Sequence, residues 1–261
     1  MKLALGIEYN GSLYYGWQKQ NKLPNIQDQL ETAISIIANS KTKVFCAGRT
    51  DSGVHATGQV IHFITKKHRL ISEWTKGINF YLPNDITVLW VIQVKKNFHA
   101  RFSAIYRRYR YIIYNNESRP AIFKNGITHV KNYLDEKKML RSSKCLLGEH
   151  DFSAFRSSQC QSISAYRKIY YFNIIRQNKY IIFDIKASSF LHNMVRIIIG
   201  SLIEVGSGKK SELWIHNILK QRKRVLSGVT APSNGLYLVD VKYPSCFLIP
   251  KSNIGPIFLN I

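Results

Sequence analysis

The sequence predicts an α+β protein made of two similar halves, residues 1–100 and 101–261, with mixed, largely antiparallel sheets that meet at a basic cleft. Two observations carry this prediction. Strand-like alternation and helical spacing of apolar residues follow one another as β-α-β-β-α-β, and this order occurs twice. Hydrophobic residues make up 45% of the 261 residues and charged residues 20%, so the chain can bury a core for one or two domains.

The first half opens with clear local signals. Residues 2–9 alternate as a strand does, and the turn cluster Asn10-Gly11-Ser12 ends that strand. Asn25 is the expected cap of a helix, and Asp28 stands where a carboxylate suits a helix N-terminus. The apolar face of this helix is formed by Ile26, Leu30, Ala33, Ile34 and Ile37.

Strand and helix signals alternate through the rest of the first half. The polar loop 48–58 separates two apolar stretches, and Ser72 is the expected N-cap of a second helix. The predicted elements are strands at residues 43–47 and 59–65, a helix at 72–81 and a strand at 86–94.

The second half repeats this order with one additional helix. The predicted elements are a strand at residues 107–114, a helix at 134–147, a hairpin at 166–176 and 180–186, helices at 190–205 and about 212–223, and a strand at 236–241. This order is the one found in ferredoxin-like domains. Because clefts between similar halves commonly bind ligands, we expect the functional site there, with a hinge near residues 95–105.

Positive charge is abundant and unevenly distributed. Thirty-eight Lys and Arg stand against 15 Asp and Glu, a formal charge of +23. Residues 1–100 carry 12 basic and 6 acidic residues, whereas residues 101–261 carry 26 and 9. Residues 95–111 hold six basic and five aromatic residues and no acid. Codon drift toward lysine is an alternative source of part of the charge, but this clustering favours a nucleic acid as partner.

Several classes of protein lack support in the sequence. No apolar run reaches the 18 or so residues of a membrane helix, and the first residues lack the features of a secretory leader, so we expect a cytoplasmic protein. The cysteines form no Cys-x-x-Cys pair and are not accompanied by a His pair at zinc-finger spacing. We therefore expect no metal site. The four cysteines are Cys46, Cys145, Cys160 and Cys246.

The densest polar block lies in the loop between two predicted strands of the first half. Ala47-Gly48-Arg49-Thr50-Asp51-Ser52-Gly53-Val54-His55-Ala56 contains two glycines, a basic residue and an acid two positions later. An acid in so basic a chain is a candidate for chemistry. The alternative is an ordinary Asp-Ser-Gly turn in which Asp51 bonds its own backbone, and spacing alone favours that alternative.

A second block, Tyr106-Arg107-Arg108-Tyr109-Arg110-Tyr111, has the pattern of a strand. Alternation places Arg107, Tyr109 and Tyr111 on one face and Arg108 and Arg110 on the other. Such a strand can stack bases and contact phosphates through its arginines. It can equally be an ordinary sheet strand with aromatic cross-strand pairs and solvated arginines, and the residue types leave both interpretations open.

Arg196 interrupts the apolar spacing of the predicted helix at residues 190–205. Burying a guanidinium without a partner is costly. Either an acid across the cleft pairs with Arg196, or the side chain extends to solvent. The sequence around it is compatible with both.

Several separated motifs together resemble the bacterial tRNA pseudouridine synthases of the TruA type. The similarity runs through nearly the whole chain, and Ser52, where the family often has alanine, is a conservative departure. In order, the motifs are Tyr15-Gly16-Trp17-Gln18, GRTDSGVHA at residues 48–56, Phe98-His99-Ala100-Arg101-Phe102, Arg108-Tyr109-Arg110-Tyr111, Gly148-Glu149-His150-Asp151-Phe152, KASSFLHNMVR at residues 186–196, and Gly235-Leu236-Tyr237-Leu238.

The resemblance implies an isomerase that converts uridine to pseudouridine at positions 38, 39 and 40 of the tRNA anticodon stem-loop. It implies a homodimer without metal or cofactor. Asp51 would be the catalytic aspartate, and Arg49 would push into the RNA helix as the target uridine flips out. Tyr109 would pack on the flipped uracil, and Arg196 would pair with the catalytic aspartate. The implied RNA-contacting residues are Phe98, His99, Ala100, Arg101, Phe102, Gln159, Cys160, Gln161, Ser162 and Ile163, besides Arg107, Arg108 and Arg110 of the strand.

The implied reaction agrees with these residue types. Pseudouridine formation breaks the bond between C1′ and N1, rotates the uracil and joins C1′ to C5. It needs an anionic carboxylate but no redox centre or metal, and an adjacent arginine favours the charged form of Asp51. Whether the carboxylate attacks C1′, adds to the uracil ring or acts through a glycal stays open.

Two other classes of function compete with this interpretation. A non-catalytic RNA-binding protein with two RRM-like halves should carry a basic residue followed by alternating glycines and aromatics in a strand, and that pattern is missing. A metal-dependent nuclease should have several convergent carboxylates, and no other acid lies near Asp51 in the sequence.

Overall fold

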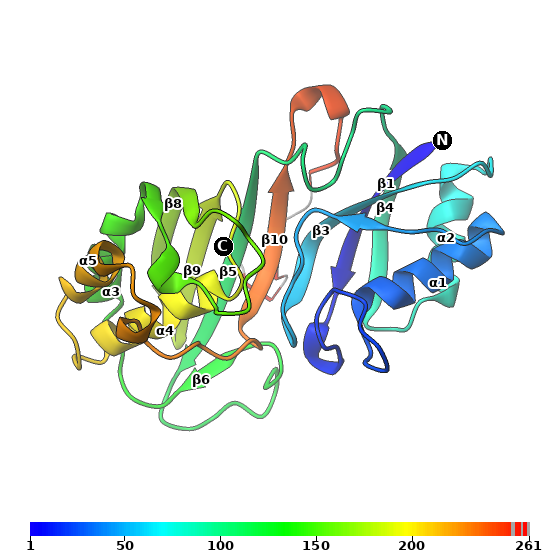
Figure 1. Ribbon diagram of the computed structural model, residues 1–261. Coiled ribbons are helices and arrows are strands. Elements are labelled where there is room, and N and C mark those ends of the chain that lie inside the picture. Colours follow the sequence, from blue (N-terminus) through cyan, green and yellow to red (C-terminus); the bar gives the residue numbers. More distant parts are fainter. Residues whose placement is uncertain (252–253, 257, 260–261) are drawn as a thin grey trace. The chain divides into compact units, whose positions relative to one another are not determined.

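The computed structural model describes residues 1–251, 254–256 and 258–259, and it divides into two compact units. Unit 1 consists of Met1–Arg107 and Tyr237–Ile261, and unit 2 of Arg108–Leu236. Both units combine strands and helices, so the predicted α+β class is confirmed (Figure 1). The boundary differs from the one expected at residue 100, because the last strand of the chain pairs with a strand of the first half.

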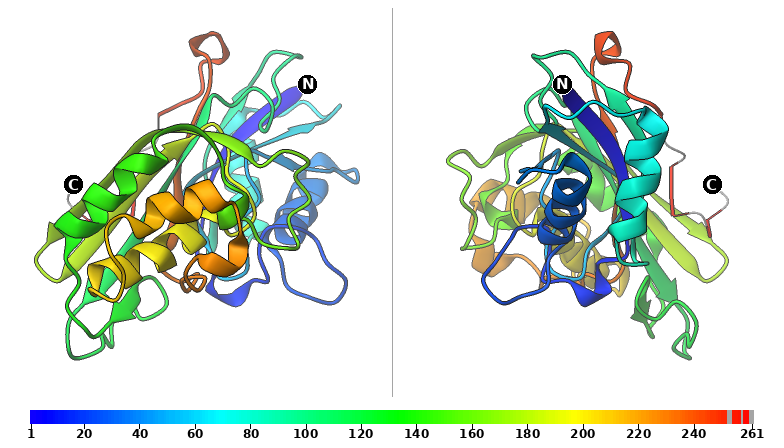
Figure 2. Two further views of the ribbon diagram at one scale, coloured as in Figure 1. Left: turned by 60° about the vertical axis from the view of Figure 1, so that its left-hand side comes forward. Right: turned by 90° about the vertical axis from the view of Figure 1, so that its right-hand side faces the viewer.

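Unit 1 has a largely antiparallel sheet with two helices on one face (Figure 2). The strand order is β4-β1-β3-β10, with β2 paired to β3. All of these strand pairs are antiparallel except that of β10 with β3, which is parallel. The elements are β1 (Lys2–Tyr9), α1 (Ile26–Ala38), β2 (Phe45–Cys46), β3 (His55–Ile64), α2 (Ile71–Tyr81), β4 (Ile86–Gln93) and β10 (Leu236–Lys242).

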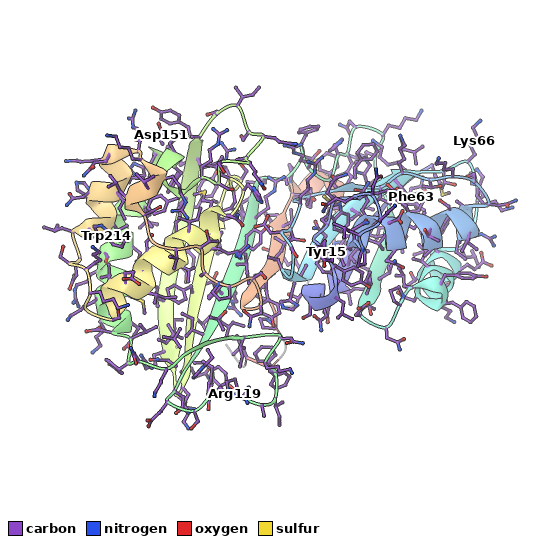
Figure 3. The ribbon with its side chains drawn as sticks, turned by 60° about the horizontal axis from the view of Figure 1, so that its bottom comes forward. Tyr15, Phe63, Lys66, Arg119, Asp151 and Trp214 are labelled. Atoms are coloured by element: carbon purple, nitrogen blue, oxygen red, sulfur yellow. The ribbon has the colours of Figure 1, made fainter. Side chains whose placement is uncertain are left out.

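The core of unit 1 lies between this sheet and its helices. Leu30 and Ile34 of α1 are fully buried. Trp74 of α2 is also fully buried, and its ring lies 5.5 Å from that of Phe63 in β3, a residue that Figure 3 labels. Because each such side chain contributes roughly 1.5–3 kcal/mol when buried, the sheet is a stable support for the loop that precedes β3.

Local capping signals decide where the two helices of unit 1 begin. The Asn25 side chain accepts a hydrogen bond from the Asp28 N–H (2.8 Å), as predicted. The expected cap at Ser72 is wrong, because α2 begins one residue earlier. There the Glu73 carboxylate accepts a hydrogen bond from the Leu70 N–H (2.8 Å) and supplies the cap from within the helix.

The strands around the polar loop differ more from the prediction. The strand expected at residues 43–47 is reduced to Phe45–Cys46. The strand expected at residues 59–65 begins at His55, so part of the expected loop belongs to the sheet. The reason is a long-range one: His55 and Ala56 pair with Tyr237 and Leu238 of β10, which no local pattern reveals.

Unit 2 consists of strands with three helices that cover one face of them (Figure 2). The strand order is β5-β9-β8-β7, with β6 paired in parallel to β5. No helix in the residues described is both long and apolar enough to cross a membrane. The elements are β5 (Tyr106–Asn115), β6 (Thr128–Val130), α3 (Glu136–Ser143), β7 (Gly148–Asp151), β8 (Tyr166–Gln177), β9 (Tyr180–Ala187), α4 (Met194–Gly206) and α5 (Trp214–Gln221).

The helices of unit 2 are shorter than their apolar spacing predicts. The helix expected at residues 190–205 begins at Met194, because Asn193 has a left-handed backbone with a φ of 60°. The helix expected at residues 134–147 is limited to α3. The Asp135 side chain caps it by accepting a hydrogen bond from the Lys138 N–H (2.9 Å). Apolar side chains therefore continue beyond these helix ends into turns that pack on the same core.

Candidate active site

The loop between β2 and β3 carries the polar block found in the sequence. Arg49 is exposed, Thr50 is buried, and Asp51 is half-buried. The Val54 N–H donates to the Asp51 carbonyl oxygen (3.1 Å), and Gly53 has a φ of 74°, which glycine adopts readily. The block therefore makes a tight turn immediately after Asp51.

A distant segment, residues 9–17, holds this loop in place. The Trp17 N–H donates to the Thr50 carbonyl oxygen (3.0 Å), and the Gly53 N–H donates to the Tyr14 carbonyl oxygen (3.1 Å). The Tyr9 hydroxyl lies 2.8 Å from the Thr50 hydroxyl, and burial raises the pKa of Tyr9, so it stays neutral. The backbone on both sides of Asp51 is thus fixed by unit 1 itself. Sequence reasoning missed Tyr9 and Tyr14 because no motif shows which distant segment packs on a loop.

Arg107 joins this loop to the segment at residues 98–102. Its buried guanidinium donates to the Ala47 carbonyl oxygen through Nε (3.2 Å) and Nη2 (2.9 Å). It also donates to the carbonyl oxygens of Arg101 and Ala104. Internal carbonyl groups therefore take donors of the Arg107 guanidinium, and its predicted contact with RNA stays a prediction. Its role in the structure is to tie two loops of unit 1 together.

The segment at residues 98–102 is partly core and partly surface. Phe98 and Ala100 are fully buried, so their side chains anchor the segment, and the predicted RNA contacts of these two residues stay predictions. The ring of His99 lies 4.4 Å from that of Phe102, which is 75% exposed. The exposed Arg101 guanidinium lies 5.4 Å from the centre of the Phe102 ring. Arg101 and Phe102 thus present a charge and an aromatic face on the surface.

Unit 2 contributes Tyr109 from β5 and Arg196 from α4. Tyr109 is 7% exposed, and its ring meets that of Phe190 edge to face with centroids 5.1 Å apart. The Arg196 side chain donates from Nε to the Ala231 carbonyl oxygen (2.7 Å) and from Nη1 to Asn193 Oδ1 (3.0 Å). These neutral acceptors orient the guanidinium at the first turn of α4, so Arg196 is not a side chain that simply extends to solvent.

Arg108 and Arg110 lie on β5 on either side of Tyr109 and share one carboxylate. Arg108 Nε lies 2.6 Å from Asp184 Oδ1, and Arg110 Nε lies 3.2 Å from Asp184 Oδ2. The three side chains are 12%, 5% and 6% exposed, in the order Arg108, Arg110 and Asp184. Both charges are paired within unit 2, so these arginines are not solvated, and their predicted contact with RNA stays a prediction.

The segment at residues 159–163 lies on the surface of unit 2. Gln159, Gln161 and Ile163 are exposed, and Cys160 and Ser162 are half-buried. Burial raises the pKa of the Cys160 thiol, but the backbone N–H groups of His192 and Ser162 and the charge of Arg156 outweigh it and lower the pKa overall. Across the described part of the chain, no three His, Cys, Asp or Glu side chains gather as metal ligands.

A comparison with known families decides what these motifs belong to. A family model described as tRNA pseudouridine synthase matches residues 6–103 and 143–244. The chain belongs to this family. It is therefore an isomerase that converts uridine to pseudouridine in tRNA.

Curated relatives match this synthase over its whole length. The tRNA pseudouridine synthase A of Actinobacillus pleuropneumoniae serotype 3 is 54% identical over 259 residues, 99% of each chain. The protein of the same name from Haemophilus influenzae strain Rd is 56% identical, over 99% of this chain and 96% of its own. Among solved structures, a Cbf5-Nop10-Gar1 complex matches with a TM-score of 0.36 and 12% identity. That match covers 77% of this chain and 45% of that chain, and it is too distant to support an argument.

Gly16 of the synthase lies against the Asp51 loop in a conformation that favours glycine. Its φ is 92°, and a β-carbon there would lie 2.8 Å from the Thr50 carbonyl oxygen. We expect Gly16→Ala to displace the loop and to lower the single-turnover rate of pseudouridine formation roughly 100-fold, because small misplacements of reacting groups are costly.

Gly208→Ala is the matched control for this prediction. Gly208 has a φ of 79°, but a β-carbon added to it would meet nothing within 4 Å. Both variants should lose roughly 1 kcal/mol in urea denaturation from backbone strain alone. Only Gly16→Ala should lose activity, and equal rates for the two variants would mean that the contact with the loop is unimportant.

His62 makes the stability of unit 1 depend on pH. It is 2% exposed, and its Nδ1 accepts a hydrogen bond from the Ala100 N–H (3.1 Å). Burial, with smaller contributions from the charges of His99 and Lys2, lowers the pKa of His62 to about 4. The unfolded chain, with an ordinary pKa of about 6.5, therefore takes up a proton first as the pH falls.

We expect the free energy of unfolding to decrease as the pH falls from about 6.5 to about 4, and protonation of His62 should contribute to this decrease. His62→Asn keeps an acceptor for the Ala100 N–H but removes the titrating group. Its melting temperature should fall less steeply than that of the wild type over this interval. Parallel curves for the two proteins would assign the acid sensitivity to other groups.

Proposed function

We propose that this synthase modifies the uridines at positions 38, 39 and 40 of the tRNA anticodon stem-loop, with Asp51 as its catalytic carboxylate. The observation that carries the proposal is the fixed Asp51 loop. It presents a half-buried acid beside the exposed Arg49, within the GRTDSGVHA block, and residues 9–17 hold its backbone. A preorganised carboxylate is what the exchange of the C1′–N1 bond for a C1′–C5 bond requires.

The target uridine must first leave the base stack. Flipping a nucleotide costs a few kcal/mol, and less in a loop than in a stem. We propose that Arg49 fills the gap left by the flipped base. The exposure of the Arg49 side chain, two residues before Asp51, supports this role.

Tyr109 and Arg196 are proposed to act on the same uridine. Tyr109 would pack on the flipped uracil and help to remove the proton from C5, and its ring is held in place by Phe190. Arg196 would pair with the Asp51 carboxylate. The neutral acceptors that orient the Arg196 guanidinium support a positioned charge.

RNA binding outside the flipped base is proposed to use two basic or polar surface segments, one in each unit. In unit 1, Arg101 and the exposed ring of Phe102 offer a cation and a stacking face. In unit 2, the exposed Gln159 and Gln161 offer amide groups, together with the fully exposed Ile163. Phosphate contacts make such binding strongly dependent on salt.

We further propose a cytoplasmic homodimer that needs no cofactor, and two units derived from similar ferredoxin-like halves. The family resemblance supports the dimer, and the β4-β1-β3 order with β2 on β3 supports the ferredoxin-like description of unit 1. Sedimentation equilibrium with and without tRNA tests the dimer. A monomer under both conditions would contradict it.

The experiment that tests the proposed substrate is tritium release from tRNA transcripts labelled at uracil C5. A transcript with uridine at positions 38, 39 and 40 should release tritium. A transcript with cytidine at those positions, and uridine elsewhere, should release none. Equal release from both transcripts would show that the synthase modifies other uridines.

A further inference from the structure

We propose that the outer helical surface of unit 2 binds the phosphate backbone of tRNA outside the anticodon loop. This surface, which we call the α3–α5 basic surface, consists of residues 131–144 and 209–224. The inference rests on the proposed function and extends it by a second RNA contact. It depends on contacts within unit 2 only.

The α3–α5 basic surface has a large excess of positive charge. Its 30 residues contain 11 Lys and Arg and three acids. All of the basic residues except Arg224 are exposed. Such a density of cations on one face is the electrostatic signature of a polyanion-binding protein.

The corresponding helices of unit 1 provide an internal control for codon drift. Residues 25–41 and 69–82, which contain α1 and α2, have three basic residues and three acids among 31 residues. Drift toward lysine codons acts on the whole chain. It should therefore load both sets of exposed helices, and only the helices of unit 2 carry the excess.

The three acids of the α3–α5 basic surface already have partners within unit 2. Glu136 pairs with Arg176, which lies outside the surface (2.8 Å), and Glu212 pairs with Arg141 (2.6 Å). The Asp135 side chain caps α3. Most of the lysines therefore have no acid of their own surface left to neutralise them.

The shape of the α3–α5 basic surface is also compatible with binding a nucleic acid backbone. A hollow of about 380 Å³ is lined by Arg141, Lys144 and His216, and also by the Glu212 carboxylate that pairs with Arg141, so the Lys144 ammonium borders a space large enough for a phosphate. Just before α5, the Lys210 ammonium lies 5.3 Å from the centre of the ring of Trp214, the first residue of α5, which Figure 3 labels. Discrete cations on the helices fit phosphate groups better than an anionic lipid surface, which would favour inserted apolar side chains.

The geometry of α4 separates this surface from the proposed chemistry. Arg196 lies in the first turn of α4, and the helix ends at Gly206, just before Lys209 and Lys210. At 1.5 Å per residue, the ten residues between Arg196 and Gly206 span about 15 Å. The surface is therefore expected to strengthen tRNA binding without changing the rate of the chemical step.

The test compares a surface variant with a control variant that removes the same charge. The surface variant is Lys137→Gln/Lys144→Gln/Lys220→Gln, and the control is Lys41→Gln/Lys66→Gln/Lys76→Gln, on exposed positions of unit 1. Each is titrated with full-length tRNA and with an isolated anticodon stem-loop RNA, and single-turnover tritium release is measured at saturating RNA.

We expect the surface variant to bind full-length tRNA roughly 10-fold more weakly at physiological salt. The slope of its log association constant against log salt concentration should be less steep by about 2 to 3. Its affinity for the stem-loop, its single-turnover rate and the affinities of the control variant should stay within about 2-fold of the wild type.

Three outcomes would overturn the proposal. Equal weakening of both RNAs would assign the lysines to the stem-loop site. If the control variant weakened tRNA binding equally, the effect would come from the net charge of the protein and not from this surface. Unchanged tRNA binding, with loss of binding to phosphatidylglycerol vesicles, would make the partner a membrane surface. Failure of the proposed function gives a different result, because wild-type protein would then bind tRNA without releasing tritium from positions 38, 39 and 40.

Discussion

Asp51→Asn is expected to abolish pseudouridine formation while tRNA binding persists. The amide keeps the size of the side chain but carries no negative charge, and every proposed route for the reaction uses that charge. Loss of a central catalytic group lowers turnover by roughly 10³-fold or more. Tritium release from labelled tRNA at saturating enzyme measures this effect directly.

The structure explains why this variant should fold and bind normally. The backbone of the loop is held by Trp17, Tyr14 and Val54 through main-chain hydrogen bonds that do not depend on the Asp51 carboxylate. Removal of an acid also reduces repulsion of RNA phosphates, so affinity for tRNA should be equal or higher.

Asp51→Glu serves as the companion variant, because it keeps the charge but moves it by one methylene. It should lose activity less completely than the asparagine variant. Full activity of Asp51→Asn would remove Asp51 from the catalytic role.

Asp184→Asn is expected to cause the largest loss of stability. The Asp184 carboxylate is 6% exposed and neutralises Arg108 and Arg110, which are themselves buried in the sheet. The variant removes the charge that pairs with both guanidinium groups, and breaking a buried pair in this way costs roughly 3–5 kcal/mol. Urea denaturation at neutral pH measures the loss.

Glu212→Gln is the matched control for Asp184. It removes the acid of the Arg141–Glu212 pair, whose side chains are 51% and 37% exposed. A solvent-exposed pair contributes only about 0–1 kcal/mol, so the two variants should differ by several kcal/mol. Similar stabilities would mean that the sheet accommodates both arginines without Asp184.

The Asp184 pairs also bear on activity. Arg108 and Arg110 flank Tyr109 on β5, and their shared partner on β9 fixes the strand on both sides of that residue. We therefore regard Asp184 as a positioning residue. Under conditions where Asp184→Asn remains folded, its single-turnover rate should decrease more than its affinity for tRNA.

Local signals were sufficient wherever the structure depends on neighbours in the sequence. The strand at residues 2–9 has the predicted bounds, and Asn25 caps α1 as expected. The GRTDSGVHA block and the other motifs are sufficient to indicate the family, because motif residues keep their order along the chain. In each case the physical cause lies within a few residues of the effect.

Long-range contacts account for what the sequence did not predict. β3 begins early because β10 pairs with it, although about 180 residues separate the two strands. Arg107, Arg108 and Arg110 form one run of basic residues, and nothing in that run shows that carbonyl oxygens hold the first and Asp184 the other two.

The sequence by itself therefore determined the class of fold, most strands and helices, the family and the acid proposed for catalysis. Only the tertiary structure decided which arginines are internal, which segment holds the Asp51 loop, and which helices carry the excess of positive charge on their exposed side. The reason is physical: an arginine is the same residue in the sequence whether its guanidinium binds RNA or pairs with a buried carboxylate. Its surroundings, set by contacts between distant segments, decide between the two.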